Sequence, residues 1–235
     1  MGTIVEIKDL HFGYRRRAVF EGINIDLSLG VNFIAGINGA GKTTLCRLML
    51  GDLRPRRGTI GAPGGSTGYL PQAFGYPPRF TVAEFVTHFA WLHGVPRKLR
   101  ASRVQEALNL VGLAQRAEER MGALSGGMLR RAGIAQALVH QPQLVLLDEP
   151  TVGLDPRQRV DLRSLLTQLG ATTTLVVSTH LLEDVAAIGG HVVVLHEGTV
   201  RFSGSATEMA AHAEDGSGSL DKAFLALTAT EEKVA

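Results

Sequence analysis

Four short apolar runs recur along the chain, each flanked by glycine, proline or polar residues. They occupy residues 31–35, 144–147, 174–177 and 192–195. Their apolarity is continuous rather than alternating, which is typical of strands that are covered on both faces in a parallel sheet. Helical patterns follow three of the runs, at about residues 41–51, 156–169 and 181–188. The pattern therefore predicts an α/β fold in which parallel strands alternate with helices.

The N-terminal and middle segments carry different patterns. Apolar positions partly alternate between residues 4 and 29, which predicts a half-exposed antiparallel layer. From residue 76 to 125 the patterns are helical, and Thr81 followed by Glu84 has the form of a capping box. We therefore expect a core at about residues 1–75 and 126–205, with a helical subdomain inserted at 76–125. A C-terminal tail at about 206–235 should contain a flexible joint and one short helix.

Composition narrows the class of protein. Hydrophobic residues make up 45% and charged residues 20%, which is ordinary for a globular domain. The formal net charge is +2, so charge gives no reason to expect a nucleic-acid partner. The single cysteine, Cys46, cannot form an internal disulfide, which fits a reducing compartment. No secretory signal and no apolar run of about 18 residues is present, so any membrane role should depend on a partner.

Residues 36–44 read GINGAGKTT, which matches Gly-x4-Gly-Lys-[Ser/Thr] between an apolar strand and a helix. In such a loop, backbone N–H groups point inward at phosphate oxygens, and the helix N-terminus adds a positive dipole end. Lys42 should bridge the β- and γ-phosphates, and the Thr43 hydroxyl should bind Mg²⁺. The rest of the cradle comprises Asn38, Gly39, Ala40, Gly41 and Thr44. The Asn-Lys-x-Asp run of guanine recognition is absent, which favours ATP.

Two further stretches carry candidate chemistry. The apolar run at 144–147 ends in Asp148 and Glu149, at a strand end where ligands bind in open α/β sheets. Asp148 should hold Mg²⁺ through a water, and Glu149 can polarise the water that attacks the γ-phosphate. Ser125 then caps a helix whose first turn holds Gly126 and Gly127. Two such glycines cost about 1 kcal/mol each, which is tolerated where backbone approaches an anion, although an interdomain turn would also use them.

With these motifs in this order, the chain resembles the nucleotide-binding subunits of ATP-binding cassette (ABC) transporters, most closely the exporter-like branch. The resemblance implies a P-loop NTPase fold with a RecA-like parallel sheet core, an N-terminal antiparallel β layer and an inserted α-helical subdomain. It also implies that Ser125-Gly126-Gly127 is the signature sequence, which contacts the γ-phosphate held by the opposite subunit. The remaining implied roles are adenine stacking by Tyr14, contact with Mg²⁺ and attacking water by Gln72, linkage of the two sites by Asp155, and γ-phosphate sensing by His180. Taken alone, Tyr14 and His180 have structural explanations as well, and Asp155 before Pro156 is a natural helix N-cap. Position 128 holds Met where Gln is commonest, and position 37 holds Ile where Pro is frequent, but neither side chain is central to the phosphate contacts.

One copy of each motif means that a monomer cannot complete a site, so the resemblance implies a second nucleotide-binding subunit around two ATP and Mg²⁺. It further implies transmembrane permease subunits that hold this chain at the cytoplasmic, inner face of the membrane. The aromatic-rich segment from Phe74 to Trp91 could contact the permease or form the core of the helical insertion. Two other classes stay open: a soluble ABC-type ATPase acting on DNA or ribosomes, and a non-hydrolysing ATP sensor.

Overall fold

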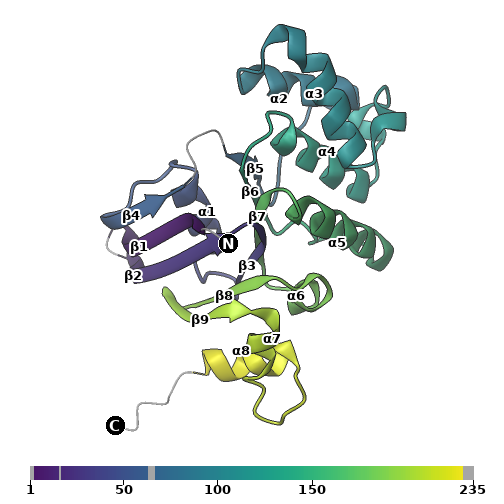
Figure 1. Ribbon diagram of the computed structural model, residues 1–235. Helices are drawn as coiled ribbons and strands as arrows, with labels where there is room; N and C mark the ends of the chain where they lie inside the picture. The colour runs from purple at the N-terminus through teal and green to yellow at the C-terminus, as the bar shows by residue number, and fades with distance from the viewer. Residues whose placement is uncertain (1–2, 16, 63–66, 230–235) are drawn as a thin grey trace. The chain divides into compact units, whose positions relative to one another are not determined.

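The computed structural model describes residues 3–15, 17–62 and 67–229 of the 235-residue chain (Figure 1). The chain divides into two compact units. The first comprises Met1–Ala62 with Ser178–Ala235, and the second comprises Pro63–Val177. We describe each unit by itself.

The first unit contains an antiparallel sheet near the N-terminus. Strands β1 (Thr3–Tyr14), β2 (Arg17–Ser28) and β4 (Arg57–Gly61) pair antiparallel in the order β2-β1-β4. Along β2 the side chains of Ile23, Ile25 and Leu27 are buried, while those between them are exposed. Successive residues of a strand face opposite sides, so this alternation buries one face of the layer and leaves the other in water. The predicted half-exposed antiparallel layer is confirmed.

The same unit holds two buried parallel strands. β3 (Gly30–Ala35) pairs parallel with β8 (His191–His196), and β8 pairs antiparallel with β9 (Thr199–Ser205). The residues from Val192 to Leu195 are fully buried, as expected for continuous apolar runs covered on both faces. The helices of this unit are α1 (Lys42–Met49), α6 (Leu182–Ile188), α7 (Ala206–Ala210) and α8 (Leu220–Thr228). The short helix predicted in the tail is α8.

The second unit joins a pair of parallel strands to a group of helices. β5 (Gly68–Leu70) pairs parallel with β6 (Leu144–Asp148), and β7 (Thr174–Thr179) follows α5 (Pro156–Gly170), with its last two residues assigned to the first unit. Helices α2 (Val82–Leu92), α3 (Arg97–Leu110) and α4 (Gly126–Leu138) contact one another in pairs (Figure 1). Two 3-10 turns, Ala114–Arg116 and Met121–Ala123, connect α3 to α4.

The capping signal that the sequence predicts for the start of α2 is also present in the structure. The Thr81 hydroxyl accepts a hydrogen bond from the Glu84 amide, and the Glu84 carboxylate accepts one from the Thr81 amide, so the capping box that starts α2 is confirmed. The structure thus has the predicted fold class, with parallel strands, an antiparallel N-terminal layer and a helical segment between β5 and α4. The bounds of the predicted core, insertion and tail stay a prediction, because the two compact units divide the chain at other positions.

Candidate nucleotide-binding site

The loop at residues 36–44 links the end of β3 to α1 in the first unit, and its path requires glycine. A Cβ at Gly36 would lie 2.7 Å from the carbonyl oxygen of Leu195. A Cβ at Gly41 would lie 2.8 Å from ring atoms of Phe20, and the backbone there has φ +103°, which side-chain-bearing residues rarely adopt. The glycines predicted from the motif are therefore needed by the loop itself, before any ligand is considered.

The N-terminus of α1 is suited to binding an anion. Gly41 is the N-cap and provides no side-chain hydrogen bond, and the first turn contains no acidic residue, so the positive end of the helix dipole is not neutralised by its own side chains. Lys42 is buried, and its Nζ donates to the carbonyl oxygens of Gly36 at 2.8 Å and Ile37 at 3.2 Å. Thr43 is exposed beside it. A cation, a dipole end and a hydroxyl therefore lie together on one loop, which fits a phosphate chain with Mg²⁺.

The other predicted residues of the loop lie within the same turn. Ala40 is buried, Thr44 is half-buried, and Asn38 and Gly39 are exposed. Gly39 has φ +87° and open space around the position of a Cβ, so its backbone can approach a ligand without obstruction.

Two more predicted residues belong to the first unit. The amide of Gly36 donates to the carbonyl oxygen of Thr179 at 3.3 Å, so the exposed His180 follows a strand end that is bonded to the start of the phosphate loop. Tyr14 lies at the end of β1 with 43% of its surface exposed, and Phe12 meets its ring edge-on at 5.0 Å between centroids. Such packing leaves area on the tyrosine ring for an aromatic ligand.

In the second unit, the paired carboxylates end a fully buried strand. Asp148 and Glu149 are 1% and 4% exposed, and Glu149 has φ +49°, a conformation that costs free energy in a residue with a side chain. Leu70 of β5 pairs with Leu147 of β6 in parallel register. Because neighbouring parallel strands end at the same edge, Gln72 and the two carboxylates follow adjacent strand ends. Gln72 is exposed there.

The signature residues begin α4. Ser125 is the N-cap, and its hydroxyl accepts from the Met128 amide at 3.4 Å, so the predicted cap is confirmed. Ser125 and Gly126 are exposed, and a Cβ at Gly126 would meet no atom within 4 Å. Gly127 packs more closely, because a Cβ there would lie 3.1 Å from the side chain of Gln158. The surface at the start of α4 therefore lets backbone amides approach an outside group.

Asp155 begins the neighbouring helix. Its carboxylate accepts from the Gln158 amide at 2.9 Å, with Pro156 in the first turn, so its role as N-cap of α5 is confirmed. Gln158 also packs against Gly127, which places the predicted linking residue next to the signature turn. Asp155 is exposed, so one of its oxygens remains available beyond the cap.

Arg130 is a residue of this region that no motif identified. Its guanidinium donates to the carbonyl oxygen of Gln72 at 2.9 Å and weakly to that of Pro71 at 3.4 Å. Burial lowers the pKa of Arg130, and the charge of Asp148 acts in the opposite direction. The helix that starts at Ser125 is thereby tied to the backbone of Gln72. An arginine one turn into an ordinary helix gave no sequence signal, because its partner is 58 positions away.

Close packing also connects α4 to the segment that carries Gln72. A Cβ at Gly133 would lie 2.6 Å from Leu70 Cδ1 and 3.0 Å from the Phe74 ring, so α4 packs directly against the segment that carries Gln72. The Gln136 amide adds a bond to the Tyr69 carbonyl oxygen at 2.7 Å. The second unit thus holds its four motifs on one connected framework, while the first unit joins the phosphate loop to His180.

A family model described as ABC transporter matches residues 20–152, which is more than half of the chain. The chain belongs to the ABC transporter family. It is 36% identical over 88% of its length to the uncharacterised ABC transporter ATP-binding protein YxlF of Bacillus subtilis, covering 72% of that protein. It is 32% identical to the Nod factor export ATP-binding protein I of Ralstonia nicotianae, with 89% of this chain and 69% of that protein covered.

Solved ABC structures agree with the fold. The structure of cbiO1 from Clostridium perfringens, part of the ABC transporter complex cbiONQ, matches with a TM-score of 0.81 and 27% identity, covering 92% of this chain and 93% of the other. The predicted family, the P-loop NTPase fold and the class of enzyme are confirmed. The chain is an ABC ATP-binding domain, of the family that hydrolyses ATP to power transport.

The described residues contain neither a cluster of metal-binding side chains nor a membrane-spanning helix. In residues 3–15, 17–62 and 67–229, no group of three or more His, Cys, Asp or Glu forms a metal cluster. Mg²⁺ in nucleotide sites takes few protein ligands and completes its coordination with phosphate oxygens and water, so the absence of such a cluster does not argue against the predicted Mg²⁺ site. Among the same described residues, no helix is long and apolar enough to cross a bilayer.

Proposed function

We propose that this chain is the ATP-hydrolysing subunit of an ABC exporter and that it closes head to tail with a second such subunit around two ATP. The observation that carries the proposal is the phosphate loop: a buried Lys42 on the carbonyls of Gly36 and Ile37, next to a helix N-terminus without a side-chain cap. Positive charge concentrated on a glycine-rich backbone loop binds phosphate groups.

Each site residue then has one task. Lys42 holds the β- and γ-phosphates, aided by the amides of the loop from Asn38 to Thr44. Thr43 and Asp148 would hold Mg²⁺, which would supply neutralisation of the charge that develops on the phosphates. Glu149 accepts a proton from the attacking water, and Gln72 positions that water. Further contacts come from His180 to the γ-phosphate and from Tyr14 to adenine.

The signature turn at the start of α4 is the part of this chain that we propose to contact the second subunit. Ser125 and Gly126 are exposed at the start of α4, and Asp155 is exposed beside them. We assign this surface to the nucleotide bound by the opposite subunit, because one chain carries one phosphate loop and one signature. The γ-phosphate then links the two chains, and its loss by hydrolysis separates them. The motion drives a membrane-embedded permease, which also holds the chain at the inner face of the membrane.

The direction of transport and the site where the permease docks are finer parts of the proposal. Export follows the relative named as a Nod factor export protein. For docking, the structure separates the aromatic residues of the helical segment. Phe85 is 1% exposed and belongs to the core, whereas Phe80 and Trp91 are 36% and 56% exposed. The explanation as core therefore applies to Phe85, and we propose the permease contact for Phe80 and Trp91.

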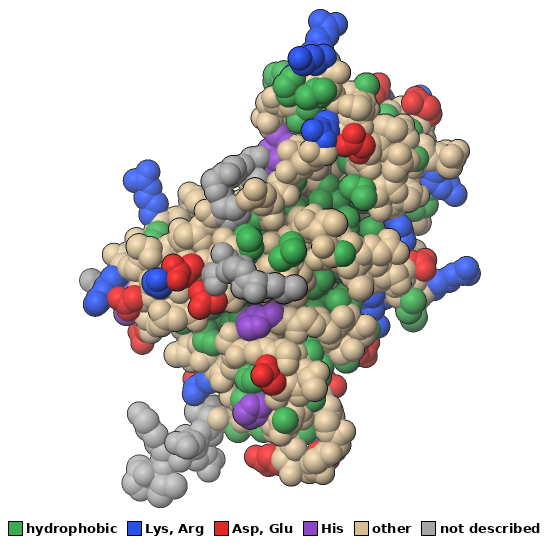
Figure 2. Space-filling model, viewed as in Figure 1, with side chains coloured by type: hydrophobic (Ala, Val, Ile, Leu, Met, Phe, Trp, Pro, Cys, Tyr) green, Lys and Arg blue, Asp and Glu red, His purple; other side chains and the backbone are tan. Residues whose placement is uncertain are grey.

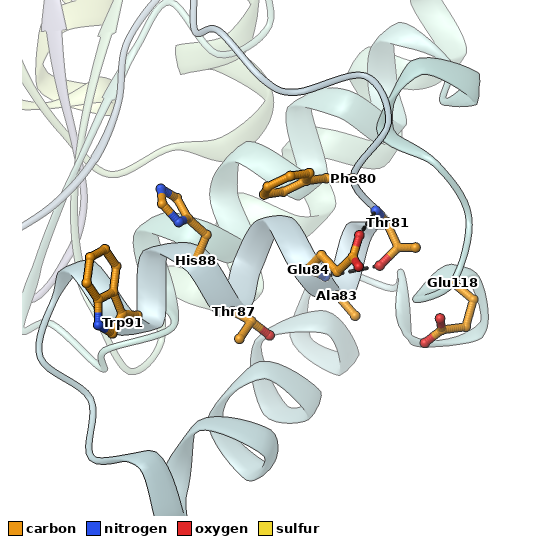
Figure 3. Close-up of a pocket in the computed structure, with 8 residues that line it drawn as sticks. All are labelled: Phe80, Thr81, Ala83, Glu84, Thr87, His88, Trp91 and Glu118. Atoms are coloured by element: carbon orange, nitrogen blue, oxygen red, sulfur yellow. Dashed lines mark hydrogen bonds between the residues drawn. The ribbon is translucent and has the colours of Figure 1, made fainter.

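The exposed rings follow one side of α2. Figure 3 shows Phe80, His88 and Trp91 along that side, and the rings are spaced at 6.4 Å and 5.9 Å between successive centroids. They line a groove of about 430 Å³ together with Thr81, Ala83, Glu84, Thr87 and Glu118. An apolar groove with an acidic edge suits a short amphipathic helix that carries a cation. We assign it to a cytoplasmic segment of the permease.

The proposed catalysis is tested with Glu149→Gln. Removal of a general base lowers the rate by about 10²–10⁴-fold, so the variant should lose hydrolysis while still binding ATP. It should accumulate as an ATP-bound dimer, measured by light scattering after size-exclusion chromatography with ATP and Mg²⁺. Glu214→Gln, at an exposed position of the tail, is the matched control and should behave as wild type. Hydrolysis by Glu149→Gln at the wild-type rate, or full turnover by a monomer, would refute the proposal.

A further inference from the structure

The turn between α2 and α3 carries a second exposed surface, which the nucleotide site does not use and which shares only Trp91 with the groove. Trp91, Leu92 and Leu99 are 56%, 55% and 38% exposed, three large apolar side chains within nine positions. Arg97 and Lys98 lie between them and are exposed as well. We call these five residues the turn surface.

Its charge has a single sign. From residue 85 to 105 the sequence contains four cationic side chains and no aspartate or glutamate. Arg103 pairs with Glu106 at 3.1 Å, and Arg100 donates to the Val95 carbonyl oxygen at 2.8 Å. Within the part of the chain that the structure describes, neither Arg97 nor Lys98 forms an ion pair. These two charges therefore face the solvent without a protein partner.

Helix stability does not explain the placement of these cations. Arg97, Lys98 and Arg100 occupy the first turn of α3, where the helix dipole is positive and acidic side chains are favoured. That turn contains no acidic residue, and its N-cap, Pro96, forms no side-chain cap. Three cations at the positive end of a helix disfavour the helix, so an external anion is the partner that this arrangement suits.

Hydrogen bonds hold the apolar and cationic side chains on one surface. The Val95 amide donates to the Ala90 carbonyl oxygen at 2.9 Å, and Arg100 binds the Val95 carbonyl oxygen from the other helix. The turn is thereby fixed to both α2 and α3. Figure 2 shows Lys and Arg side chains beside hydrophobic ones over the part of the second unit where Figure 1 places α2 and α3. All five residues of the turn surface are exposed, and four of them lie outside the groove along α2.

We propose that the turn surface binds the anionic headgroup layer of a membrane directly. Tryptophan and leucine insert at the boundary between headgroups and acyl chains, while lysine and arginine contact lipid phosphates. Anionic lipids attract such cations, and the apolar side chains add an attraction that salt does not screen. Exposed cationic side chains beside exposed apolar ones match the phosphates and the adjoining acyl chains of a membrane surface.

The inference rests on the proposed function only in one respect, that a permease brings this chain to the membrane. Trp91 belongs both to the groove and to the turn surface. A permease segment in the groove would therefore lie directly beside the lipid contact. The turn surface would add a second attachment to the one through the permease, and would limit how the helical segment can rotate during the ATP cycle.

Vesicles without permease test the inference apart from transport. The full chain is sedimented with vesicles of phosphatidylcholine alone or with added phosphatidylglycerol, at roughly 0.05 M and 0.5 M salt, which spans weak to strong screening. We expect binding to the anionic vesicles at low salt. Each cation near such a surface changes affinity about fivefold, so Arg97→Ala with Lys98→Ala should bind about 25-fold more weakly. Trp91→Ala should remove the residual binding at high salt.

The control removes the same charge elsewhere. Arg54→Ala with Arg201→Ala changes two exposed arginines and should retain wild-type binding. Basal ATPase activity of the Arg97/Lys98 variant should stay unchanged, and its melting temperature should be equal or higher, because two cations leave the positive end of α3. Equal binding to both vesicle types, or equal loss in both double variants, would overturn the inference. So would unchanged vesicle binding with weakened permease binding, since the turn surface would then contact protein. None of these outcomes depends on Glu149 or on dimer formation, so the proposed function can stand or fall separately.

Discussion

Gly41 closes the phosphate loop into α1, and alanine at this position meets two obstacles. The backbone has φ +103°, which costs an L-residue about 1–2 kcal/mol. The new Cβ would also lie 2.8 Å from two ring atoms of Phe20 and 3.2 Å from Val19 Cγ1. Phe20 is 1% exposed and cannot move into solvent, so overpacking adds about 1–3 kcal/mol. Gly41→Ala should therefore destabilise the protein by about 2–5 kcal/mol.

Gly39→Ala is the matched control, because it changes the same loop by the same methyl group. Its φ is +87°, but no atom lies within 4 Å of the added Cβ, so only the conformational cost of about 1–2 kcal/mol applies. In a chain of this length 1 kcal/mol corresponds to about 2–4 °C in melting temperature. Calorimetry should place Gly41→Ala below Gly39→Ala by at least about 2 °C. ATP affinity, measured by isothermal titration, should fall in both.

A double variant isolates the contact. Phe20→Leu removes ring atoms from the position that the Cβ would occupy, so Gly41→Ala should cost less in that background than in wild type. The difference is a coupling free energy between the two positions, of the kind that contacting residues show at about 0.5–3 kcal/mol. Equal melting temperatures for Gly41→Ala and Gly39→Ala, with no coupling to Phe20, would refute the argument that Phe20 restricts the loop.

Two further predictions concern the helical segment. Phe80→Glu should reduce transport by a reconstituted complex while its ATPase activity stays near that of the wild type. Parallel loss of both activities in this variant would argue against docking in the groove. Phe85→Ala should instead destabilise the fold by about 3–5 kcal/mol, because the Phe85 ring is 1% exposed. Burial lowers the pKa of His93 below its ordinary value of 6.5. The unfolded chain then binds more protons below that pH, so stability is full above about pH 6.5 and declines as the pH falls. His93→Asn should show a shallower decline in melting temperature between about pH 7 and pH 5, and an unchanged slope would contradict this assignment.

The elements that the sequence predicted are defined by local signals, whereas β4, β5, β9 and α7 were not predicted. A continuous apolar run, a capping box at Thr81 and the N-caps Ser125 and Asp155 all act within a few positions along the chain, and each is found where the sequence indicates. The phosphate loop is similar, since the cradle, the cation and the helix dipole come from nine consecutive residues. The predicted roles of Tyr14, Gln72 and His180 toward ATP stay predictions.

The remaining features depend on residues far apart in the chain. Arg130 contacts the backbone of Gln72, and Gly133 lets α4 pack against Leu70, but neither residue has a local pattern that distinguishes it. The aromatic segment could not be divided from sequence, because helical spacing alone does not tell which rings face the core. Only the packing of α2 against its neighbours buries Phe85 and exposes Phe80 and Trp91.

The sequence by itself therefore determined the family chemistry of this chain, an ATP site made from short contiguous motifs, and the alternation of strands and helices that carries it. Tertiary structure alone decided which side chains connect those motifs and which are left on the surface. The physical reason is range: backbone conformation and capping respond to neighbours within a turn or two, whereas burial and long-range hydrogen bonds exist only once distant segments meet.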